Sequence, residues 1–512
     1  MKSNATSKPA AFVLSATAAA LLASFAGAAR AEDAPTTADL DQRIKVLERQ
    51  LEIQQEDAAA KAKDAPVVTA SDKGFSFKSP KGDYEFKFKG LVQSDFRYYL
   101  GDGPSGVAPA ATNPRFNDTV LLRRVEPTFE LTVGQIGFVR IQPQFNGSTP
   151  ATSDVYGEVR LLPAFYVRAG KFKEPVVLEN LQSTSNIEFI ERSLVNEIGP
   201  NRDLGLQIGG EFLGGTTSYA FGYFNGAADG RDADSTTTNT GSNDVDNRKE
   251  LAARLFTEPF KNSPGLFQGL GFGVGGSFGP KVEAPSASDS TTQQNFLPRY
   301  RSPGQNTVFQ YRSATAASTT CKLNTGATGA CTSANGVVTV TSAGSNGVYA
   351  DGDETRISPQ AYWYYNSFGL LGEYIISSTE VSIDPSSAKL KNKAWEVYAS
   401  YLLTGEDATY RGVKVRNAFK LGQPGWGAFE IAARYAELEI DSDAFPIYAN
   451  PVSAISKEKS YTVGVNWYLN NNVRWEINYS STKFDGGGGG TATAPLDRQD
   501  EKALFGRFQL SF

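Results

Sequence analysis

Apolar and polar residues alternate with a period of two along most of the chain. Residues 84–89 read YEFKFK, so that aromatic and charged side chains take turns. The same alternation returns in FVRIQPQF at 138–145, FEIAAR at 429–434 and VRWEINYS at 473–480. Successive side chains of a β-strand point to opposite faces, so each segment predicts a strand with one apolar and one polar face.

These strands are expected to form a membrane barrel, although a soluble β-sandwich also alternates. The apolar face is rich in aromatic residues near strand ends, as the interfacial girdles of a membrane barrel require. No stretch of 18 or more apolar residues is present that would predict a transmembrane helix. The chain ends LFGRFQLSF, which resembles the terminal recognition strand of bacterial outer-membrane proteins. The predicted fold is an all-β transmembrane antiparallel β-barrel of about 16 strands.

In residues 36–63, before the strands begin, the apolar residues no longer recur at every second position. Leu40, Ile44, Leu47 and Leu51 follow a 4-3-4 spacing with charged residues between them. This heptad pattern predicts a short coiled-coil helix. Two heptads are too short to be stable alone, so a single amphipathic helix or a frayed linker is the alternative. A linker over 64–79 and the barrel over 80–512 are expected to follow.

The predicted connections between strands have two lengths. Tight turns are expected at NNN, 470–472, and GQPG, 422–425. Long polar loops are expected at 226–247, 281–356 and 481–499, which suits the extracellular end of a barrel. The stretch 281–356 is too long for a plain loop and is expected to carry a hairpin that includes 337–340. An extra hairpin there leaves the strand count open between 16 and 18.

The N-terminus predicts export from the cytoplasm. Lys2 and Lys8 precede an apolar run at 10–22, and ARA at 29–31 is typical of a cleavage site. We therefore expect a signal peptide over 1–31. Because export leads to an oxidising compartment, Cys321 and Cys331 are expected to form a loop disulfide, with free thiols as the alternative.

Histidine is absent from the chain, which removes the usual metal ligand and general base. A serine–histidine mechanism is thereby excluded, whereas a glycosidase that uses two carboxylates is not. The net charge is −5 and becomes more acidic when the basic signal peptide is removed, which argues against nucleic acid as a partner. We expect no enzyme activity, no cofactor and no metal.

Several segments resemble the phosphate-selective porin O and P family. They are LLRR at 121–124, GKFKEP at 170–175, FIERS at 189–193, GPNRDLG at 199–205, YLLTGE at 401–406, WGAFE at 426–430 and GVNWYLN at 464–470. The resemblance extends from about residue 80 to the end of the chain. It implies a homotrimer of 16-stranded barrels among the lipids of the bacterial outer membrane, with a third loop folded into each pore. It also implies a ladder of basic residues for anions and an N-terminal coiled coil on the periplasmic side.

The polar faces of the early strands supply candidates for that ladder. If the aromatic faces contact lipid, the basic residues of the opposite faces line the lumen, where they would attract small anionic solutes. Their alternative role is to pair with Glu85, Glu126, Glu130 and Glu158 and brace the wall. The predicted pore-lining residues are Lys87, Lys89, Arg97, Arg124, Arg140, Arg160 and Arg168.

The segment expected to fold inward, 174–203, is more acidic than an anion-selective constriction requires. Its candidate constriction residues are Glu188, Glu191, Arg192 and Arg202. The expected function is passive diffusion of small hydrophilic solutes, preferably anions such as phosphate. The alternative within this class is a general or cation-leaning porin governed by the acidic segment. A barrel enzyme and a plugged structural tether are alternatives from other classes.

Overall fold

The computed structural model describes residues 36–101, 116–146, 150–233, 247–283, 296–314, 318–322, 328–329, 338–342 and 347–512. The predicted signal peptide, 1–31, lies outside these residues. The chain forms two compact units, residues 1–65 and 66–512. Within the described residues, no helix is both long enough and apolar enough to span a bilayer.

The first unit contains helix α2, Thr37–Asp64. A capping box begins it, because the Thr36 hydroxyl accepts a hydrogen bond from the Asp39 amide and the Asp39 carboxylate accepts one from the Thr36 amide. The four apolar heptad residues lie 45–63% exposed along this helix. Its association with other helices remains a prediction.

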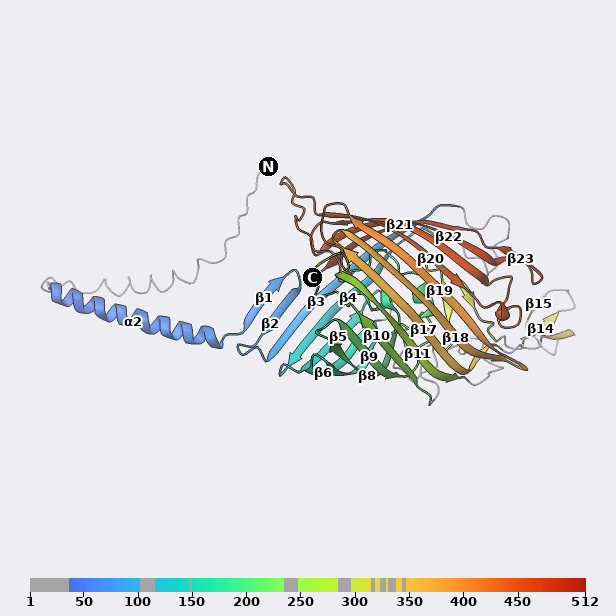
Figure 1. The fold of residues 1–512 in the computed structure, drawn as a ribbon, viewed down its shortest axis with the longest axis horizontal. Coiled ribbons are helices and arrows are strands. Elements are labelled where there is room, and N and C mark those ends of the chain that lie inside the picture. The colour runs from blue at the N-terminus through green and yellow to red at the C-terminus, as the bar shows by residue number, and fades with distance from the viewer. Residues whose placement is uncertain are drawn as a thin grey trace. The chain divides into compact units, whose positions relative to one another are not determined.

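The second unit is a closed antiparallel barrel of 16 strands, shown as a ribbon in Figure 1. Neighbouring strands pair in sequence order from β3 to β11, then β11 with β17, and in order again to β22. Strand β22 pairs with β24, and β24 pairs with β3, which closes the ring. A closed ring leaves no strand edge unpaired, as crossing a bilayer requires.

The barrel strands are β3 Tyr84–Tyr99, β4 Thr119–Val133, β5 Gly137–Gln144, β6 Ala151–Leu162, β7 Phe165–Lys173, β8 Arg202–Phe212, β9 Thr217–Phe224, β10 Glu250–Thr257, β11 Gly269–Val282, β17 Tyr349–Tyr365, β18 Phe368–Ile383, β19 Ser386–Leu402, β20 Ala428–Glu439, β21 Ile455–Tyr468, β22 Val473–Thr491 and β24 Glu501–Ser511. The remaining elements are β1 Val67–Ser71, β2 Gly74–Lys78, α3 Leu178–Leu181, α4 Val195–Ile198, β12 Arg299–Arg301, β13 Thr307–Gln310, β14 Ser318–Lys322, β15 Thr328–Gly329, β16 Val338–Ser342, the 3₁₀ turn η2 Ser442–Ala444 and β23 Ala494–Asp497.

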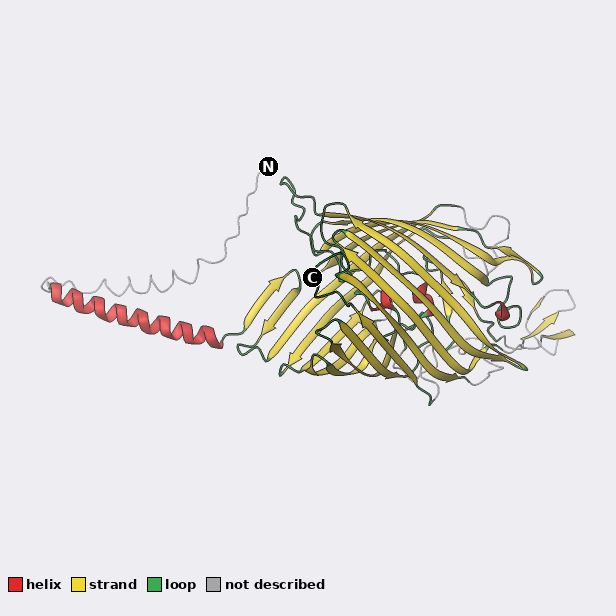
Figure 2. Cartoon of the chain, in the orientation of Figure 1, coloured by secondary structure: helices red, strands yellow, loops and turns green. Residues whose placement is uncertain are grey.

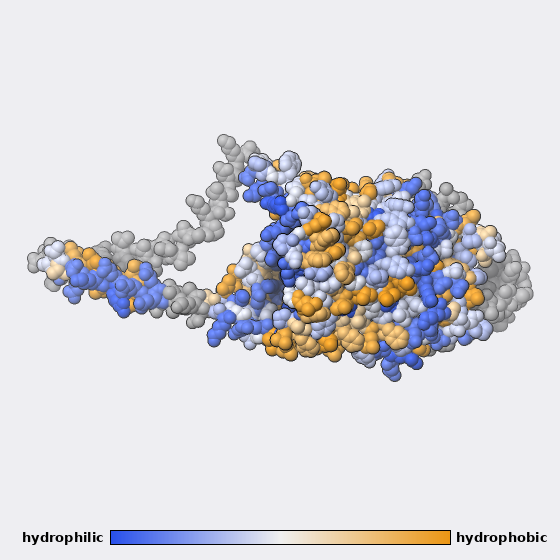
Figure 3. Space-filling view, in the orientation of Figure 1, coloured by the Kyte–Doolittle hydropathy of each residue, from blue (hydrophilic) through white to orange (hydrophobic). Residues whose placement is uncertain are grey.

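The predicted alternation decides which face of each strand meets lipid. On β3, Phe96 and Tyr98 are 39% and 52% exposed, whereas Asp95 and Arg97, which alternate with them, are buried in the interior. Figure 3 shows apolar side chains gathered over the outer face of the barrel strands, and hydrophilic ones toward the end that carries the long loops. The barrel therefore turns its apolar face outward and its charged face inward, the reverse of a soluble sandwich.

The C-terminal residue is held where the ring closes. Phe512 and Gly90 of β3 exchange two backbone hydrogen bonds, of 2.9 and 3.0 Å. A side chain at position 90 would collide with the Phe512 ring, since an added Cβ would lie 2.7 Å from it. The same ring contacts Phe75 and Phe88, whose centroids lie 6.1 and 5.6 Å away. Phe75 belongs to the hairpin β1–β2, which pairs with β3. The sequence predicts a linker over 64–79, whereas the structure has the hairpin β1–β2 within this range.

Two predicted connections differ in the structure, and a third agrees with the prediction. The tight turn at 470–472 joins β21 to β22, but 422–425 is only the end of a longer connection, 403–427. The loop predicted at 481–499 is mostly strand, because β22 continues to Thr491 and pairs with β23. Four glycines at this end of β22 take positive φ angles, which allows the strand to bend while it stays paired with β23. They are Gly486, Gly487, Gly489 and Gly490.

The long connection 283–348 contains strands, as expected. β12 and β13 form a hairpin, and β16 with β14 and β15 forms a small separate sheet. These strands do not join the barrel, so the count stays at 16. Cys321 lies in β14, whereas Cys331 lies outside the described residues, so the disulfide remains a prediction.

Candidate functional site

The segment between β7 and β8, residues 174–201, folds into the barrel interior. Its ends meet where the Glu174 amide donates to the Asn201 carbonyl at 3.0 Å. Val177, Leu178 and Ile190 along it are fully buried. Figure 2 shows its two short helices, α3 and α4, among the barrel strands. We call residues 174–201 the inserted segment.

Two sides of the barrel interior differ in charge. The inward face of β3–β8, here called the basic wall, carries most of the lumen's cations. The inward face of β18–β22, here called the acidic wall, carries mainly buried carboxylates. Basic-wall cations are Lys87, Lys89, Arg97, Arg123, Arg124, Arg140, Arg160, Arg168, Lys173 and Arg202. Acidic-wall carboxylates are Glu373, Glu396, Glu430, Glu458 and Glu476.

The acidic wall holds the backbone of the inserted segment. Helix α3 begins after Val177, which offers no side-chain cap. Glu373 of β18 supplies one from across the barrel, since its carboxylate accepts hydrogen bonds from the amides of Leu178 at 2.7 Å and Glu179 at 3.2 Å. A carboxylate that accepts hydrogen bonds from the free amides at the start of a helix is stabilising, because these buried donors would otherwise have no acceptor.

Side chains of β20, β21 and β22 continue this attachment. Arg434 donates to the Glu179 carboxylate at 3.3 Å and to the Glu191 carbonyl at 3.0 Å. Asn478 accepts from the Ile190 amide at 2.7 Å. Because all of these groups are buried, the inserted segment is held by contacts that water does not replace.

The carboxylates of the inserted segment are directed into the walls. Glu179 is bound by Arg434, and Glu191 is bound by Arg123 of β4 at 2.8 Å and by Arg97 of β3. Burial raises the pKa of Glu188 to about 8, with the Glu430 carboxylate nearby as the next cause. Near neutral pH Glu188 is therefore mostly uncharged. The acidity seen in the sequence is largely cancelled in the fold.

A cavity of about 410 Å³ lies between the basic wall and the inserted segment. Six arginines line it against four carboxylates. The arginines are Arg123, Arg124, Arg192, Arg202, Arg231 and Arg301, and the carboxylates are Glu126, Glu191, Glu197 and Asp232. We call it the arginine cavity. It shares Glu126, Thr184 and Arg202 with a second cavity of about 650 Å³, so these residues mark the passage between the two.

A β-bulge places two adjacent arginines on the same side of β4. The β3–β4 register changes from Gln93 opposite Arg124 to Ser94 opposite Leu122, which leaves Arg123 unpaired in the ladder. Neighbouring residues of a regular strand would point to opposite faces, but a bulge re-aims one of them. Both guanidinium groups consequently reach the arginine cavity.

Three cations here bind neutral oxygens rather than carboxylates. Arg124 donates to the Gln93 side chain at 2.8 Å. Lys173 and Arg192 both donate to the Gln182 carbonyl, at 3.0 and 3.2 Å. No described carboxylate forms an ion pair with any of the three, which we call the unpaired cations. They leave positive charge in the lumen beside the inserted segment.

The other predicted pore-lining residues face the interior and are paired. Lys87 pairs with Glu85 at 3.2 Å and Lys89 with Glu130 at 2.7 Å. The remaining pairs are Arg97 with Glu191, Arg140 with Glu130 and Asp154, and Arg160 and Arg168 with Glu158. Arg202 of the predicted constriction pairs with Asp154 at 2.7 Å. Among the described residues, these cations form ion pairs with carboxylates of the barrel interior. Their contacts therefore fit the alternative role, which is to brace the wall, better than the role of an unpaired charge.

The sequence analysis missed four residues of the arginine cavity or its margin: Arg123, Lys173, Arg231 and Arg301. The two adjacent arginines at 123 and 124 gave a signal in the sequence for Arg123. Only the bulge shows that both side chains point inward. Arg231 and Arg301 belong to long connections, for which a strand pattern predicts nothing.

Arg301 reaches the lumen because the hairpin β12–β13 also folds inward. Glu501 of β24 accepts hydrogen bonds from the Ser302 hydroxyl and the Gly304 amide, both at 2.7 Å. Tyr99 of β3 donates to the Gly304 carbonyl at 2.9 Å. Burial raises the pKa of Glu197 to about 7, while the neighbouring Arg301 lowers it. Glu197 and Arg301 line the same cavity, so its net charge depends on pH.

Comparison with known proteins agrees with this architecture. The profile of the family "Phosphate-selective porin O and P" matches residues 86–308 and 313–512. Porin O of Pseudomonas aeruginosa is 26% identical over 136 residues, a match that covers 26% of this chain and 31% of that protein.

Solved structures similar to this chain include an outer membrane channel and a porin. The outer membrane channel DcaP of Acinetobacter baumannii has 12% identity, and the match covers 85% of this chain and 99% of that one with a TM-score of 0.46. The anion-selective porin from Comamonas acidovorans has 10% identity, coverage of 84% and 100%, and a TM-score of 0.45. The family profile covers most of the chain and the barrel closes at 16 strands. The chain therefore belongs to the phosphate-selective porin O and P family and is an outer-membrane channel.

Proposed function

We propose that the channel passes small anions, phosphate among them, by passive diffusion without any catalytic step. The observation that carries this proposal is the set of unpaired cations beside the arginine cavity. A cation at a narrow, poorly hydrated passage lowers the entry barrier for anions. Arginine suits oxyanions in particular, because its planar fork donates two hydrogen bonds at once.

The pairing of the acidic residues argues against a cation-leaning channel. Glu179 and Glu191 are bound by arginines, and burial raises the pKa of Glu188 to about 8. The arginine cavity itself is lined by six arginines and four carboxylates, of which Glu191 is one. An ion crossing it would exchange weak contacts with several arginines, which favours flow over tight retention.

The proposed assembly is a homotrimer in which three α2 helices form a coiled coil. Its support is the row of exposed apolar residues on α2, namely Leu40, Ile44, Leu47 and Leu51. Exposed apolar stripes on a helix are stabilised when a second helix covers them. Cross-linking of a cysteine introduced at Leu47 with a three-armed maleimide, which can join three thiols, would test the assembly: covalent trimers support it, and monomers alone refute it.

The test of the transport proposal is the reversal potential of single channels in a planar bilayer under a potassium chloride gradient. We expect the sign of an anion-selective pore, and a chloride current that falls when phosphate is added at millimolar concentration. A cation-selective sign without phosphate block would favour the alternative of a cation-leaning porin. A purified barrel that conducts no ions would favour a plugged tether.

A further inference from the structure

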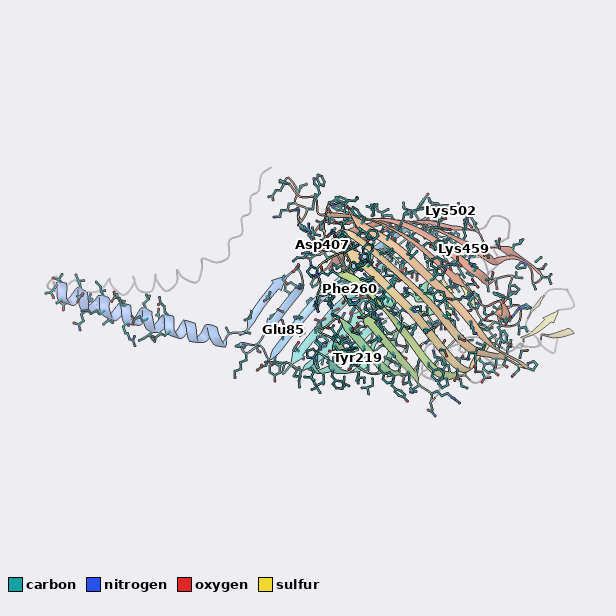
Figure 4. The ribbon with its side chains drawn as sticks, viewed as in Figure 1. Glu85, Tyr219, Phe260, Asp407, Lys459 and Lys502 are labelled. Atoms are coloured by element: carbon teal, nitrogen blue, oxygen red, sulfur yellow. The ribbon has the colours of Figure 1, made fainter. Side chains whose placement is uncertain are left out.

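Another cavity of the lumen has a different lining from the arginine cavity. Its volume is about 980 Å³, and it lies on the other side of the inserted segment, against β10, β17 and the connection 403–427. Figure 4 labels Asp407 of that connection at one end of the barrel, with Lys459 and Lys502 toward the other end. The short turns β8–β9 and β17–β18 line the same cavity. We call it the aromatic cavity.

Aromatic rings form one side of this cavity. Tyr362 lies between Phe256 and Tyr410, with both ring centroids 5.1 Å away. Tyr362 and Tyr410 are nearly parallel, at 17°. The Tyr410 hydroxyl donates to the Leu178 carbonyl at 2.6 Å, so the inserted segment fixes this ring. The rings are therefore held in place before any solute arrives.

A guanidinium group lies directly beside the rings. Arg254 of β10 stacks on Phe256 with 4.4 Å between its central carbon and the ring centroid. Its Nε donates to the Gln360 side chain at 2.8 Å, and no described carboxylate forms an ion pair with it. Arg254 is half-buried, so the remaining donors of its fork are open to the cavity.

Most carboxylates of the aromatic cavity are already paired. Glu258 binds Lys261 at 3.0 Å, and Asp407 binds Arg416 at 2.8 Å. Among the described lining residues, Glu211 is the one carboxylate that forms no ion pair, whereas Arg254 and Arg411 are both cations without one. The cavity thus offers positive charge next to flat apolar surface.

From this arrangement we infer that the aromatic cavity is a second solute site, selective for small planar anions that carry a carboxylate on an aromatic ring. The carboxylate binds the Arg254 fork, and the ring packs against the Phe256–Tyr362–Tyr410 cluster. Phosphate has the charge but no ring, and a neutral sugar has no charge for the arginine. The inference rests on the proposed anion channel and assigns it a second class of solute.

The test compares benzoate with acetate as blockers of the chloride current through single channels of the full-length protein. Both carry one carboxylate, so a difference between them reports contact with the ring. We expect benzoate to reduce the current at a concentration about tenfold lower than acetate does, since packing of one ring against an aromatic cluster contributes up to roughly that factor. Arg254→Gln should remove the difference and leave block by phosphate unchanged.

Two variants serve as controls. Arg254→Lys keeps the charge but loses the planar fork, so it should retain only part of the preference for benzoate. Lys389→Gln removes an exposed, paired cation whose partner, Glu380, does not line the aromatic cavity, and should retain all of it. Equal block by benzoate and acetate in a conducting wild-type channel would overturn this inference and leave the anion channel intact. A benzoate preference that survives Arg254→Gln would overturn it as well.

Discussion

The basic wall and the acidic wall face the same lumen but use their charged groups differently. Basic-wall residues pair mostly with carboxylates of the same wall, as Lys89 does with Glu130. Acidic-wall residues bind the inserted segment, as Glu373 does at the start of α3. One wall is braced internally, whereas the other serves as the support of the constriction. The comparison explains how an acidic segment narrows a pore without making it acidic.

The largest expected effect on stability comes from removing a contact by which the acidic wall holds the inserted segment. Arg434→Ala leaves the buried carboxylate of Glu179 without its ion-pair partner, which should destabilise the barrel by about 3–5 kcal/mol. The measurement is the temperature at which the folded band disappears on denaturing gels. The matched control is Lys393→Ala, whose pair with Glu439 is exposed at 44% and 41%, and which should cost no more than about 1 kcal/mol. Equal losses in the two variants would contradict the supporting role of the acidic wall.

The next effect concerns Arg124, one of the basic-wall cations that lack a carboxylate partner. Arg124→Gln removes a charged donor from the arginine cavity. Block of the chloride current by phosphate should then need about a tenfold higher concentration, because one hydrogen bond to a charged group contributes about that factor. Phosphate titration of the chloride current measures it. Unchanged block would mean that Arg124 does not contact the solute.

A smaller effect follows from pH. The pKa of Glu197 is raised to about 7, mainly by burial, so the group is neutral below that pH and negative above it. Anion preference should therefore decline, by about twofold in permeability ratio, as pH rises from about 6 to 8. Glu197→Gln should flatten this profile. A preference that rises with pH, or an unchanged profile in the variant, would show that another group controls it.

The smallest effect is expected at a paired cation. Arg160 pairs with Glu158, and its side chain is 63% exposed. Arg160→Gln should change stability by less than about 1 kcal/mol and leave the sign of selectivity unchanged. A shift in reversal potential as large as that of Arg124→Gln would mean that paired and unpaired cations contribute alike, which would remove the basis of the comparison.

The barrel itself could be predicted from the sequence because its signal is local. Alternation in 84–89 assigns each side chain of β3 to lipid or lumen before any neighbour is known. The ending at Phe512 likewise pointed to an outer-membrane barrel. The hairpin at 67–78 was missed because it is short and follows no long alternating run.

The site could be predicted only in part, because its decisive contacts are long-range. Glu179 and Arg434 lie 255 residues apart, so nothing in the acidic sequence of the inserted segment shows that its charge is neutralised. The bulge at Arg123 is equally hidden, because it depends on the register against β3. Sequence reasoning found Arg124 and Arg192 but not Lys173, and the fold decided which cations are paired.

The central claim is that the unpaired cations, rather than the total charge of the lumen, determine selectivity. The most direct test is the reversal potential of the triple variant Arg124→Gln, Lys173→Gln, Arg192→Gln beside the wild type, under the same salt gradient and with folded barrels confirmed on gels. We predict an anion-selective potential for the wild type and a near-zero or cation-selective potential for the variant. An unchanged anion-selective potential in the variant would contradict the claim.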